Sequence, residues 1–323
     1  MDVSVVVPIY NEEENVPHLC AALHDSLSTL SVPYEILLVD DGSSDRTWAR
    51  LVEAREQHPC IRLIRFRRNF GQTAAIAAGF HHAQGEVIVT LDADLQNDPA
   101  DIPKLLKRME EGYDVVSGWR KDRKDRFLTR RVPSIMANAL IGKITDVYLH
   151  DYGCTLKAYR KEIVQNIHLY GEMHRFIPAL ASWIGGVIGE EVVQHRARRF
   201  GQSKYGLSRT LRVLLDLATV KFLLRYSTRP LQIFGKIGLL FGLPGAAMML
   251  AVLLGHVSFL LFGTETGADL IKRPFWVITP FMLILFCLQF ISMGLLAELQ
   301  TRTYHESQKK PIYVVKERVG FET

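Results

Sequence analysis

The sequence predicts an α/β protein in which a mostly parallel sheet, with helices on both faces, is followed by a two-helix membrane hairpin. Two patterns predict this architecture. Five apolar runs that suit buried strands occur in residues 1–120, and segments compatible with helices separate the first four. Two much longer apolar runs follow in residues 231–300. Continuous apolar strands that alternate with helices indicate a parallel sheet covered on both faces.

Each predicted strand ends in polar residues. Helices are expected between the strands, for example at Val16–Leu30 and Asp45–Gln57. In parallel sheets, ligands bind outside the carboxyl ends of the strands. We therefore expect the functional site at this edge of the sheet. The predicted strands are Val3–Pro8, Glu35–Asp40, Ile61–Phe66, Val87–Asp92, Asp114–Gly118 and a shorter one at Leu156–Tyr159.

A short acidic motif, Thr90-Leu-Asp-Ala-Asp-Leu-Gln96, closes the fourth strand. Residues two apart in an extended chain share a face, so Asp92, Asp94 and Gln96 can present three oxygen ligands together. Such ligands suit Mg²⁺ or Mn²⁺, which usually share their coordination shell with substrate phosphates. The alternative is a turn whose acids cap a helix that starts at Asp98-Pro99. The motif alone leaves both interpretations open.

Two common nucleotide-binding classes lack support in the sequence. No G-x-G-x-x-G follows the first strand, and no G-x-x-x-x-G-K-[ST] occurs. Tyr10 and Glu12 after the first strand, with the acids of Asp40–Asp45 after the second, suit a base and a ribose better than bare phosphates. The segment Asp40–Asp45 also fits an ordinary loop and helix cap, so it is not specific by itself.

Charge and cysteine content narrow the class of partner. The net charge is +5, and the four cysteines are scattered without a C-x-x-C pair, which argues against a zinc site and a disulfide framework. Basic residues concentrate in 120–131, in 196–204 and beside the apolar C-terminal runs. Such patches suit nucleic acid, phosphate or anionic lipid. The basic-aromatic cluster near 200 is short and stands beside apolar runs, which disfavours nucleic acid.

The apolar runs, at about 237–262 and 275–299, each exceed the roughly 20 residues that cross a bilayer. A buried hairpin of a soluble protein is the alternative, and two such runs in succession disfavour it. Basic residues flank the pair, so the positive-inside tendency places both outer flanks in the cytosol. No secretory leader precedes the first strand. Apolar residues spaced among bases at 205–230 predict amphipathic helices in the membrane interface, with a helix packed on the domain as the alternative.

Four motifs in this order and spacing resemble those of the family-2 glycosyltransferases. More narrowly, the chain resembles over nearly its whole length the polyprenyl-phosphate glycosyltransferases, the group of dolichol-phosphate mannose synthase and the bacterial undecaprenyl-phosphate glucosyl and aminoarabinosyl transferases. The resemblance implies a GT-A fold, a nucleotide-sugar donor and a divalent cation, Mg²⁺ or Mn²⁺. The motifs are Pro8-x-Tyr-Asn-Glu12, Asp40-Asp-Gly-Ser-x-Asp45, Arg68-Asn-Phe-Gly71 and Asp92-Ala-Asp-Leu-Gln96.

The resemblance also implies roles for the residues of the donor. Asp92, Asp94 and Gln96 would hold the metal and, through it, the diphosphate. Lysine is a compact point charge for phosphate, and Lys204 lies in a loop that closes over the donor diphosphate in the family. The residues expected to bind the nucleotide are Pro8, Tyr10, Glu12, Asp41, Arg199 and Lys204.

The basic segment that follows the fifth strand is the candidate acceptor site. Arginines suit bidentate phosphate recognition. Most charge runs are solvated surfaces, but position and resemblance favour contact with a lipid phosphate for Arg120, Arg126 and Arg131, with Ser134 as a hydroxyl donor. Asp151 matches the acidic residue that the family places beside the acceptor, and a plain loop residue is the alternative. The predicted catalytic residues are Asp151, Asp94 and Arg120.

We therefore expect a membrane-bound, metal-dependent, inverting glycosyltransferase that moves a sugar from a nucleotide sugar to polyprenyl phosphate, for cell-envelope glycan or lipid modification. A UDP-sugar such as UDP-glucose or a UDP-aminoarabinose, and undecaprenyl phosphate, are favoured; a GDP-mannose-dependent mannosyltransferase is the first alternative. A non-catalytic nucleotide-sugar-binding accessory of a flippase fits less well. A processive polysaccharide synthase also fits less well, because Q-x-x-R-W is missing and two spans leave little room for a polymer channel.

The expected organisation has four parts. They are a cytosolic catalytic domain at 1–204, interfacial helices at 205–230, a transmembrane hairpin at 231–300 and a cytosolic basic tail at 301–323. The protein would be integral to the cytoplasmic membrane, with its active site and both termini in the cytosol. The membrane helices could also support a homo-oligomer, a question that the sequence leaves open.

Overall fold

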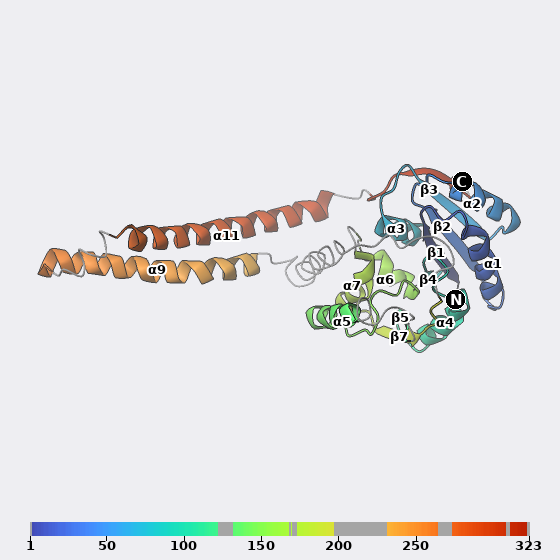
Figure 1. The fold of residues 1–323 in the computed structure, drawn as a ribbon, viewed down its shortest axis with the longest axis horizontal. Coiled ribbons are helices and arrows are strands. Elements are labelled where there is room, and N and C mark those ends of the chain that lie inside the picture. Colours follow the sequence, from blue (N-terminus) through green and yellow to red (C-terminus); the bar gives the residue numbers. More distant parts are fainter. Residues whose placement is uncertain are drawn as a thin grey trace. The chain divides into compact units, whose positions relative to one another are not determined.

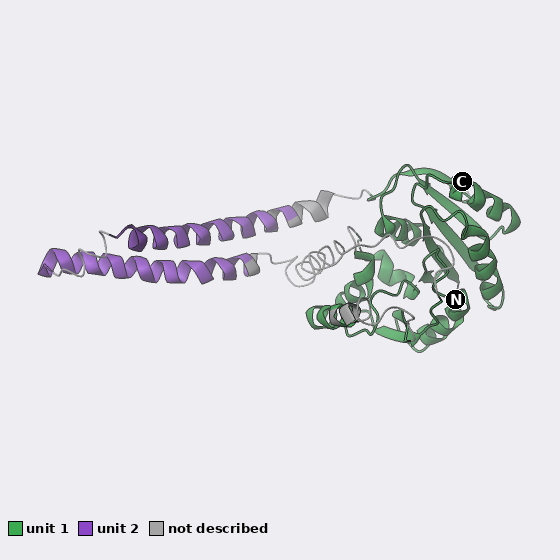
Figure 2. Ribbon diagram, viewed as in Figure 1, with its two compact units in different colours: residues 1–220, 311–323 green, residues 221–310 purple. Residues whose placement is uncertain are grey.

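The computed structural model describes residues 2–121, 132–167, 169, 173–196, 231–263, 273–307 and 311–321. The chain divides into two compact units (Figure 2): Met1–Val220 with Pro311–Thr323, and Lys221–Lys310. Several predicted features lie outside the described residues, namely Arg126, Arg131, Arg199, Lys204 and the interfacial helices at 205–230. Ser134 belongs to a described helix, but its side chain is not described.

The first unit is built on an eight-stranded sheet with the strand order β7-β5-β6-β4-β1-β2-β3-β8. Strands β1, β2, β3 and β4 pair in parallel, and β5 pairs in parallel with β7. Strand β6 is antiparallel to both β4 and β5, and β8 is antiparallel to β3. The mostly parallel sheet predicted from the sequence is confirmed. The strands are Val3–Ile9, Tyr34–Asp40, Ile61–Phe66, Val87–Thr90, Val115–Trp119, Lys157–Arg160, Ile188–Val192 and Val315–Val319, for β1 to β8.

Helices cover both faces of this sheet (Figure 1), with α1, α2 and α4 on one face and α3, α6 and α7 on the other. Helix α1 buries Leu19, Leu23 and Leu27, at the four-residue spacing of one helix face. Helix α3 packs closely on β1, since a Cβ added at Gly79 would lie 2.1 Å from a methyl of Val6. The helices are α1 Val16–Leu27, α2 Thr47–Gln57, α3 Gln72–His82, α4 Ile102–Glu110, α5 Val132–Thr145, α6 Lys161–Gln165 and α7 Ile177–Trp183.

The strand directions place the site residues. Strands β1 to β5 and β7 all run the same way, so their carboxyl ends meet at one edge of the sheet. Because β6 runs the opposite way, the segment 151–156 that precedes it lies at that same edge. The central strands are almost completely buried, as their apolar sequences predicted. The buried sheet thus fixes the positions of the loops at this edge.

The C-terminal segment differs from the expected basic tail. Residues Val315–Val319 form β8, which extends the sheet at the outer side of β3. Its sequence, VKERV, places three exposed charged residues between two half-buried valines, which suits an edge strand. This strand was not predicted from the sequence.

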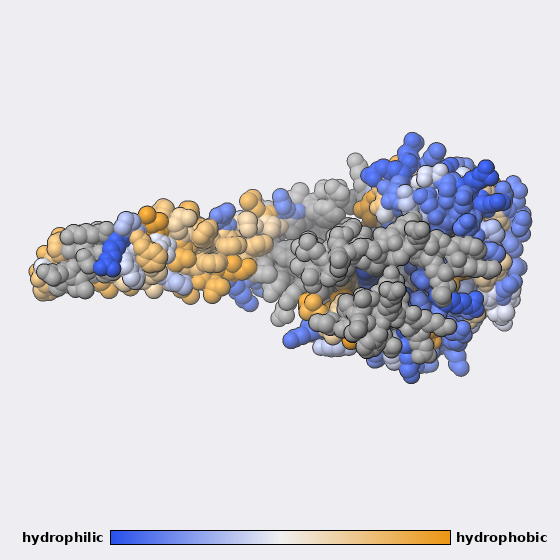
Figure 3. Space-filling model, viewed as in Figure 1, coloured by the Kyte–Doolittle hydropathy of each residue, from blue (hydrophilic) through white to orange (hydrophobic). Residues whose placement is uncertain are grey.

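The described residues of the second unit form two long helices, α9 Leu231–Phe262 and α11 Pro274–Ser307. Their segments Phe234–Phe262 and Pro274–Ala297 are long and apolar enough to cross a membrane, and few of their side chains are buried. In Figure 3 the described surface of this unit is mostly hydrophobic, whereas that of the first unit is mostly hydrophilic. Unburied apolar helices of this length are unstable in water, so these helices indicate a membrane protein, as expected.

Candidate active site

The loops after β1 and β2 are locked together at the carboxyl edge of the sheet. The backbone N–H of Asn11 donates to Ser43 Oγ, and that of Ser44 donates to Asn11 Oδ1, both at 2.9 Å. Asn11 has φ 52°, a conformation that asparagine tolerates better than most residues. The N–H of Glu12 donates to Thr47 Oγ1 at 2.9 Å. These reciprocal bonds fix the two loops as one body.

Asp41 joins this body to the loop after β3. Its Oδ1 accepts the N–H of Phe70 at 2.7 Å, and its Oδ2 accepts the N–H of Gly71 at 2.9 Å. Next to it, Gly42 has φ +69° and lies so close that an added Cβ would be 2.4 Å from the carbonyl carbon of Arg68. Burial raises the pKa of Asp41 to about 6, although the two amide bonds act in the opposite direction.

The predicted nucleoside residues share this corner of the edge. Pro8 lies near the end of β1 beside Val39 of β2, and Tyr10 follows the strand with 37% of its surface exposed. The carboxylate of Glu12 accepts the amide of Asn15 at 2.6 Å. The structure thus brings Pro8, Tyr10, Glu12 and Asp41 to two adjacent strand ends. Their role toward a nucleoside stays a prediction.

The acidic motif takes a turn rather than the extended chain that the sequence analysis assumed. Strand β4 ends at Thr90, and Leu95 adopts φ 57°, so the alternation of side chains does not continue to Gln96. Asp94 Oδ1 accepts the N–H of Gln96 at 3.1 Å. Asp98 caps the short 3-10 helix Pro99–Asp101 through the N–H of Ala100. The turn interpretation of the backbone is therefore correct, and the cap is made by Asp98 rather than by Asp92 or Asp94.

The turn nevertheless leaves the two acids close together. The pKa of Asp92 is raised to about 6, mainly by burial and to a lesser extent by the negative charge of Asp94. Asp92 Oδ1 accepts the side-chain amide of Gln72 at 2.7 Å. The neighbouring Asn97 donates to Thr155 Oγ1 at 2.9 Å, which ties the turn to the segment before β6.

The donor chemistry of this turn fits a hard divalent cation. Carboxylate and amide oxygens of Asp92, Asp94 and Gln96 are the ligand type that Mg²⁺ and Mn²⁺ prefer. Two carboxylates that repel each other also gain from a cation between them. Within the described ranges, no group of three or more His, Cys, Asp and Glu side chains is arranged to hold a metal ion by itself. A cation here would share its coordination with a bound phosphate.

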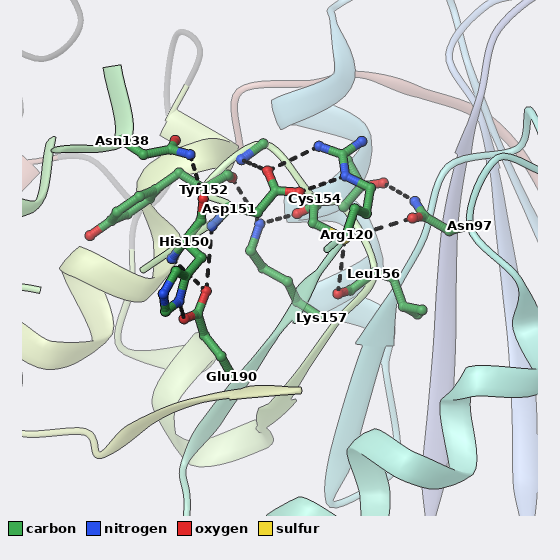
Figure 4. Close-up of polar contacts among 12 residues, drawn as sticks. Asn97, Arg120, Asn138, His150, Asp151, Tyr152, Cys154, Leu156, Lys157 and Glu190 are labelled. Atoms are coloured by element: carbon green, nitrogen blue, oxygen red, sulfur yellow. Dashed lines mark hydrogen bonds and ion pairs between the residues drawn. The ribbon is translucent and has the colours of Figure 1, made fainter. Parts of the chain in front are cut away.

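A buried ion pair occupies the other end of the edge (Figure 4). Arg120, directly after β5, donates through Nε to Asp151 Oδ2 at 2.7 Å and through a terminal nitrogen to Oδ1 at 3.0 Å. Their side chains are only 11% and 4% exposed. Gly153 N–H also donates to Asp151 Oδ1, at 3.1 Å. Two of the three predicted catalytic residues thus form one rigid bidentate unit.

Glu190 of β7 holds the residue that precedes Asp151 in the Arg120–Asp151 pair. Its Oε1 accepts the backbone N–H of His150 at 2.8 Å, and its Oε2 pairs with His150 Nδ1 at 2.7 Å. The imidazole of His150 stacks on Trp119, with 4.0 Å between the ring centroids. These contacts fix the residue immediately before Asp151. Neither Glu190 nor His150 was identified from the sequence.

Lys157 at the start of β6 is a third residue that was not identified from the sequence. It is 2% exposed, and its Nζ donates to the carbonyl oxygens of Tyr152 and Cys154. Burial lowers the pKa of its ammonium group. Its charge lies within electrostatic reach of both Asp92 and Asp151. The available signal was a lysine within the otherwise apolar run predicted at Leu156–Tyr159.

The sequence model of Glycosyl transferase family 2 matches residues 4–167 of this chain. The matched region runs from β1 through β6 and includes each of the motifs above through Asp151. The chain belongs to this family. It is therefore a glycosyltransferase, and the resemblance stated from the motifs is confirmed. Arg120, Asp151 and the acidic turn are all inside the family-2 region.

Two similar proteins match almost the whole chain. Dodecaprenyl-phosphate galacturonate synthase of Rhizobium johnstonii is 45% identical over 327 residues, covering 98% of this chain and 93% of that protein. An undecaprenyl-phosphate 4-deoxy-4-formamido-L-arabinose transferase of Proteus mirabilis is 41% identical over 320 residues, covering 98% and 94%. The alignments therefore extend through the second unit as well as the family-2 region.

Two solved structures share the fold at low identity. Glucosyl-3-phosphoglycerate synthase of Mycobacterium tuberculosis, in complex with Mn²⁺, UDP and glucosyl-3-phosphoglycerate, has a TM-score of 0.54 and 18% identity, covering 69% of this chain and 78% of that one. Mannosyl-3-phosphoglycerate synthase of Rubrobacter xylanophilus has a TM-score of 0.55 and 16% identity, covering 69% and 74%. These likenesses confirm the predicted GT-A fold and carry no more than that.

Proposed function

We propose that this family-2 glycosyltransferase transfers a sugar from a nucleotide sugar to polyprenyl phosphate. One observation carries the proposal: the similar proteins from Rhizobium johnstonii and Proteus mirabilis both act on a polyprenyl phosphate, and each covers 98% of this chain. Their sugars differ, galacturonate in one and formamido-arabinose in the other. The acceptor class is thus common to both relatives. We favour a UDP-sugar donor and undecaprenyl phosphate.

The corner formed by the loops after β1, β2 and β3 is the proposed donor side. UDP and Mn²⁺ in the glucosyl-3-phosphoglycerate synthase complex support a uridine nucleotide and a divalent cation for this fold. Asp92, Asp94 and Gln96 would hold Mg²⁺ or Mn²⁺. When bound, the cation would supply positive charge that stabilises the leaving diphosphate. Pro8, Tyr10, Glu12 and Asp41 would define the nucleoside pocket, and Arg199 and Lys204 would contact the diphosphate.

The end formed by β5, β6 and β7 is the proposed acceptor side. A phosphate monoester has a second pKa of about 6, so its attacking oxygen is largely ionised at neutral pH and needs little help from a base. Approach of this anion to the donor diphosphate requires positive charge instead. Asp151 has both oxygens engaged with Arg120, which supports an orienting role for Asp151 rather than proton removal. We propose in-line attack at the anomeric carbon with inversion, and Arg126, Arg131 and Ser134 as further contacts of the lipid phosphate.

The location of the enzyme follows from its two units. The segments before and after the hairpin both belong to the first unit, which supports their being on one side of the membrane. Basic flanks favour the cytosolic side. We therefore propose a protein of the cytoplasmic membrane with a cytosolic active site.

A lipid-product assay tests this function. The full chain, in detergent or vesicles, receives undecaprenyl phosphate and a panel of radiolabelled UDP- and GDP-sugars, and label is counted in the lipid extract. We expect lipid-linked label with at least one UDP-sugar. Label that remains water-soluble with every donor contradicts the proposal, and lipid label from GDP-mannose alone supports the mannosyltransferase alternative.

Removal of one proposed metal ligand gives the first specific prediction. Asp94→Ala should lower the rate of lipid labelling by about 100-fold or more, because charge compensation at the diphosphate is lost. A chelator should have the same effect on the wild type, and added Mn²⁺ should restore it. Full activity of Asp94→Ala in the presence of chelator would falsify the metal assignment. The exposed acid Glu56, on α2, offers a matched control as Glu56→Gln.

A further inference from the structure

The segment 311–321, here called the C-terminal strap, is the part of the first unit that no motif predicted. It follows the second apolar helix in sequence and contributes β8 to the sheet. Pairing with β3 runs from Leu63–Val319 to Phe66–Val315, and the register shifts between Arg65 and Phe66. The strap therefore contacts the strand whose following loop is bound by Asp41.

Tyr313 is the anchor of the strap. It is 7% exposed, although its neighbours Ile312 and Val314 are 40% and 50% exposed. Its ring stacks on Phe66 with 5.0 Å between centroids and an interplanar angle of 15°. Phe66 in turn meets Phe70 edge-on, at 5.7 Å. One aromatic contact chain thus leads from the strap to the loop after β3.

A backbone hydrogen bond supports the same connection. The N–H of Arg67 donates to the carbonyl oxygen of Val314 at 3.1 Å. On its other side, the loop gives the N–H groups of Phe70 and Gly71 to Asp41. The loop 67–71 is therefore held between the strap and Asp41.

We infer that the C-terminal strap is a positioning element for the donor side, and that Tyr313 is a positioning residue that acts through Phe66 and Phe70 on Asp41. The inference rests on the proposed function, because it assumes that the Asp41 corner binds the donor nucleotide. The donor pocket then reaches its final geometry only when the chain that follows the membrane hairpin has joined the sheet. The acceptor side, held by β5, β6 and β7, does not depend on the strap.

Steady-state kinetics of the full chain separate positioning from plain stability. Tyr313→Ala should raise KM for the donor by about 10-fold or more, since misplaced binding groups lose affinity steeply. KM for the lipid phosphate should stay within about twofold of wild type. Tyr313→Phe keeps the stacked ring and should restore donor KM. Val314→Ala changes an exposed neighbour whose carbonyl bond is retained, and it should behave as wild type. An unchanged donor KM, or a fall in kcat alone that follows the loss of folded protein, overturns the inference.

Nucleotide affinity provides a readout that does not need transfer. Calorimetric titration of UDP and GDP into the wild type and Tyr313→Ala should show weaker binding by the variant, by about the same factor as KM. If no lipid acceptor is ever labelled but this difference persists, the proposed function fails and the strap inference stands. Equal affinity in both proteins overturns the strap inference and leaves the proposed function intact. Failure of the wild type to bind either nucleotide counts against both.

Discussion

The donor side and the acceptor side occupy the same edge of one sheet but are held by different forces. On the donor side, backbone amides of the loops after β1, β2 and β3 bond to side chains of neighbouring loops, as in the bonds from Phe70 and Gly71 to Asp41. On the acceptor side, a few buried charges carry the geometry, above all the Arg120–Asp151 pair. Backbone-mediated contacts distribute the stabilisation of the site over many residues, whereas a buried ion pair makes it depend on two.

This difference predicts how single substitutions affect stability and binding on each side. A single neutral hydrogen bond contributes about 1 kcal/mol net, and its loss leaves the rest of the network in place. Loss of one partner from a buried ion pair leaves an uncompensated charge, which costs about 3–5 kcal/mol. The acceptor side should therefore be more sensitive to single substitutions in stability, and the donor side should show graded effects on binding.

The largest effect is expected at the ion pair. Asp151→Ala should lower the free energy of unfolding by about 3–5 kcal/mol and abolish transfer, because Arg120 is left buried without its partner. Asp151→Asn keeps the shape and some hydrogen bonding, so it should destabilise less and retain part of the turnover. Denaturant unfolding of the first unit and the lipid-labelling rate measure the two effects.

A double substitution separates charge from packing. Arg120→Met combined with Asp151→Leu should recover most of the lost stability, because apolar residues of similar volume often replace a buried pair at little cost. The double variant should remain inactive, since the positive charge for the lipid phosphate is gone. If it regains activity together with stability, Arg120 has no part in the reaction.

A smaller and more selective effect is expected at Asp41. Asp41→Asn keeps one oxygen acceptor and leaves one of the two loop amides without its partner, at a cost of about 1–3 kcal/mol. KM for the donor should rise, and KM for the lipid phosphate should not change. Glu56→Gln on the exposed face of α2 is the matched control for loss of one negative charge. A selective change in KM for the lipid phosphate would mean that Asp41 serves the acceptor side and not the donor side.

The same residue gives a pH dependence whose sign is fixed by its pKa. Burial raises the pKa of Asp41 from 3.8 to about 6, so the folded protein binds this proton more tightly than the unfolded chain does. Its contribution to the free energy of unfolding therefore increases as the pH falls from about 6 toward 3.8, and is lost as the pH rises through 6. Donor binding should follow the opposite trend, because protonation weakens the carboxylate as acceptor for Phe70 and Gly71. Donor KM measured between pH 5 and 8 should rise on the acid side of about 6 in the wild type, and Asp41→Asn should reduce that rise without removing it, because the pKa of Asp92 is also raised to about 6.

The sequence predicts the apolar strands of the sheet better than the strand β8 at its edge and the turn after β4. Strands β1 to β5 follow from apolar runs because buried parallel strands favour continuous apolar sequence. Strand β8 has the sequence VKERV, and its place depends on β3, so no local pattern reveals the pairing. The acidic motif follows the fourth strand as predicted, but its geometry differs from the prediction. Leu95 takes a left-handed conformation, which the alternation of side chains along an extended chain cannot anticipate.

The candidate site shows the same limit. Arg120 was singled out by its position after a strand and by the family resemblance, and Asp151 by that resemblance. Only the fold reveals that they form one bidentate pair. Lys157 and Glu190 escaped notice because a charged residue in a strand is usually exposed, and burial decides its importance. Their roles become visible only when the strand neighbours are known.

The smallest effect is expected one contact behind the ion pair, at Glu190. Glu190→Gln keeps one oxygen for the backbone N–H groups of His150 and Asp151 but loses the charge that faces His150. The His150 side chain is 64% exposed, so solvent screens this pair and its loss should cost less than about 1 kcal/mol. KM for the lipid phosphate should rise about two- to threefold, because Asp151 and with it Arg120 become less well oriented. Glu191→Gln, on the adjacent residue whose side chain points to the other face of the strand, is the control. A rise in donor KM instead would mean that β7 serves both sides, and that the separation between backbone-held and charge-held regions is less complete than the contacts indicate.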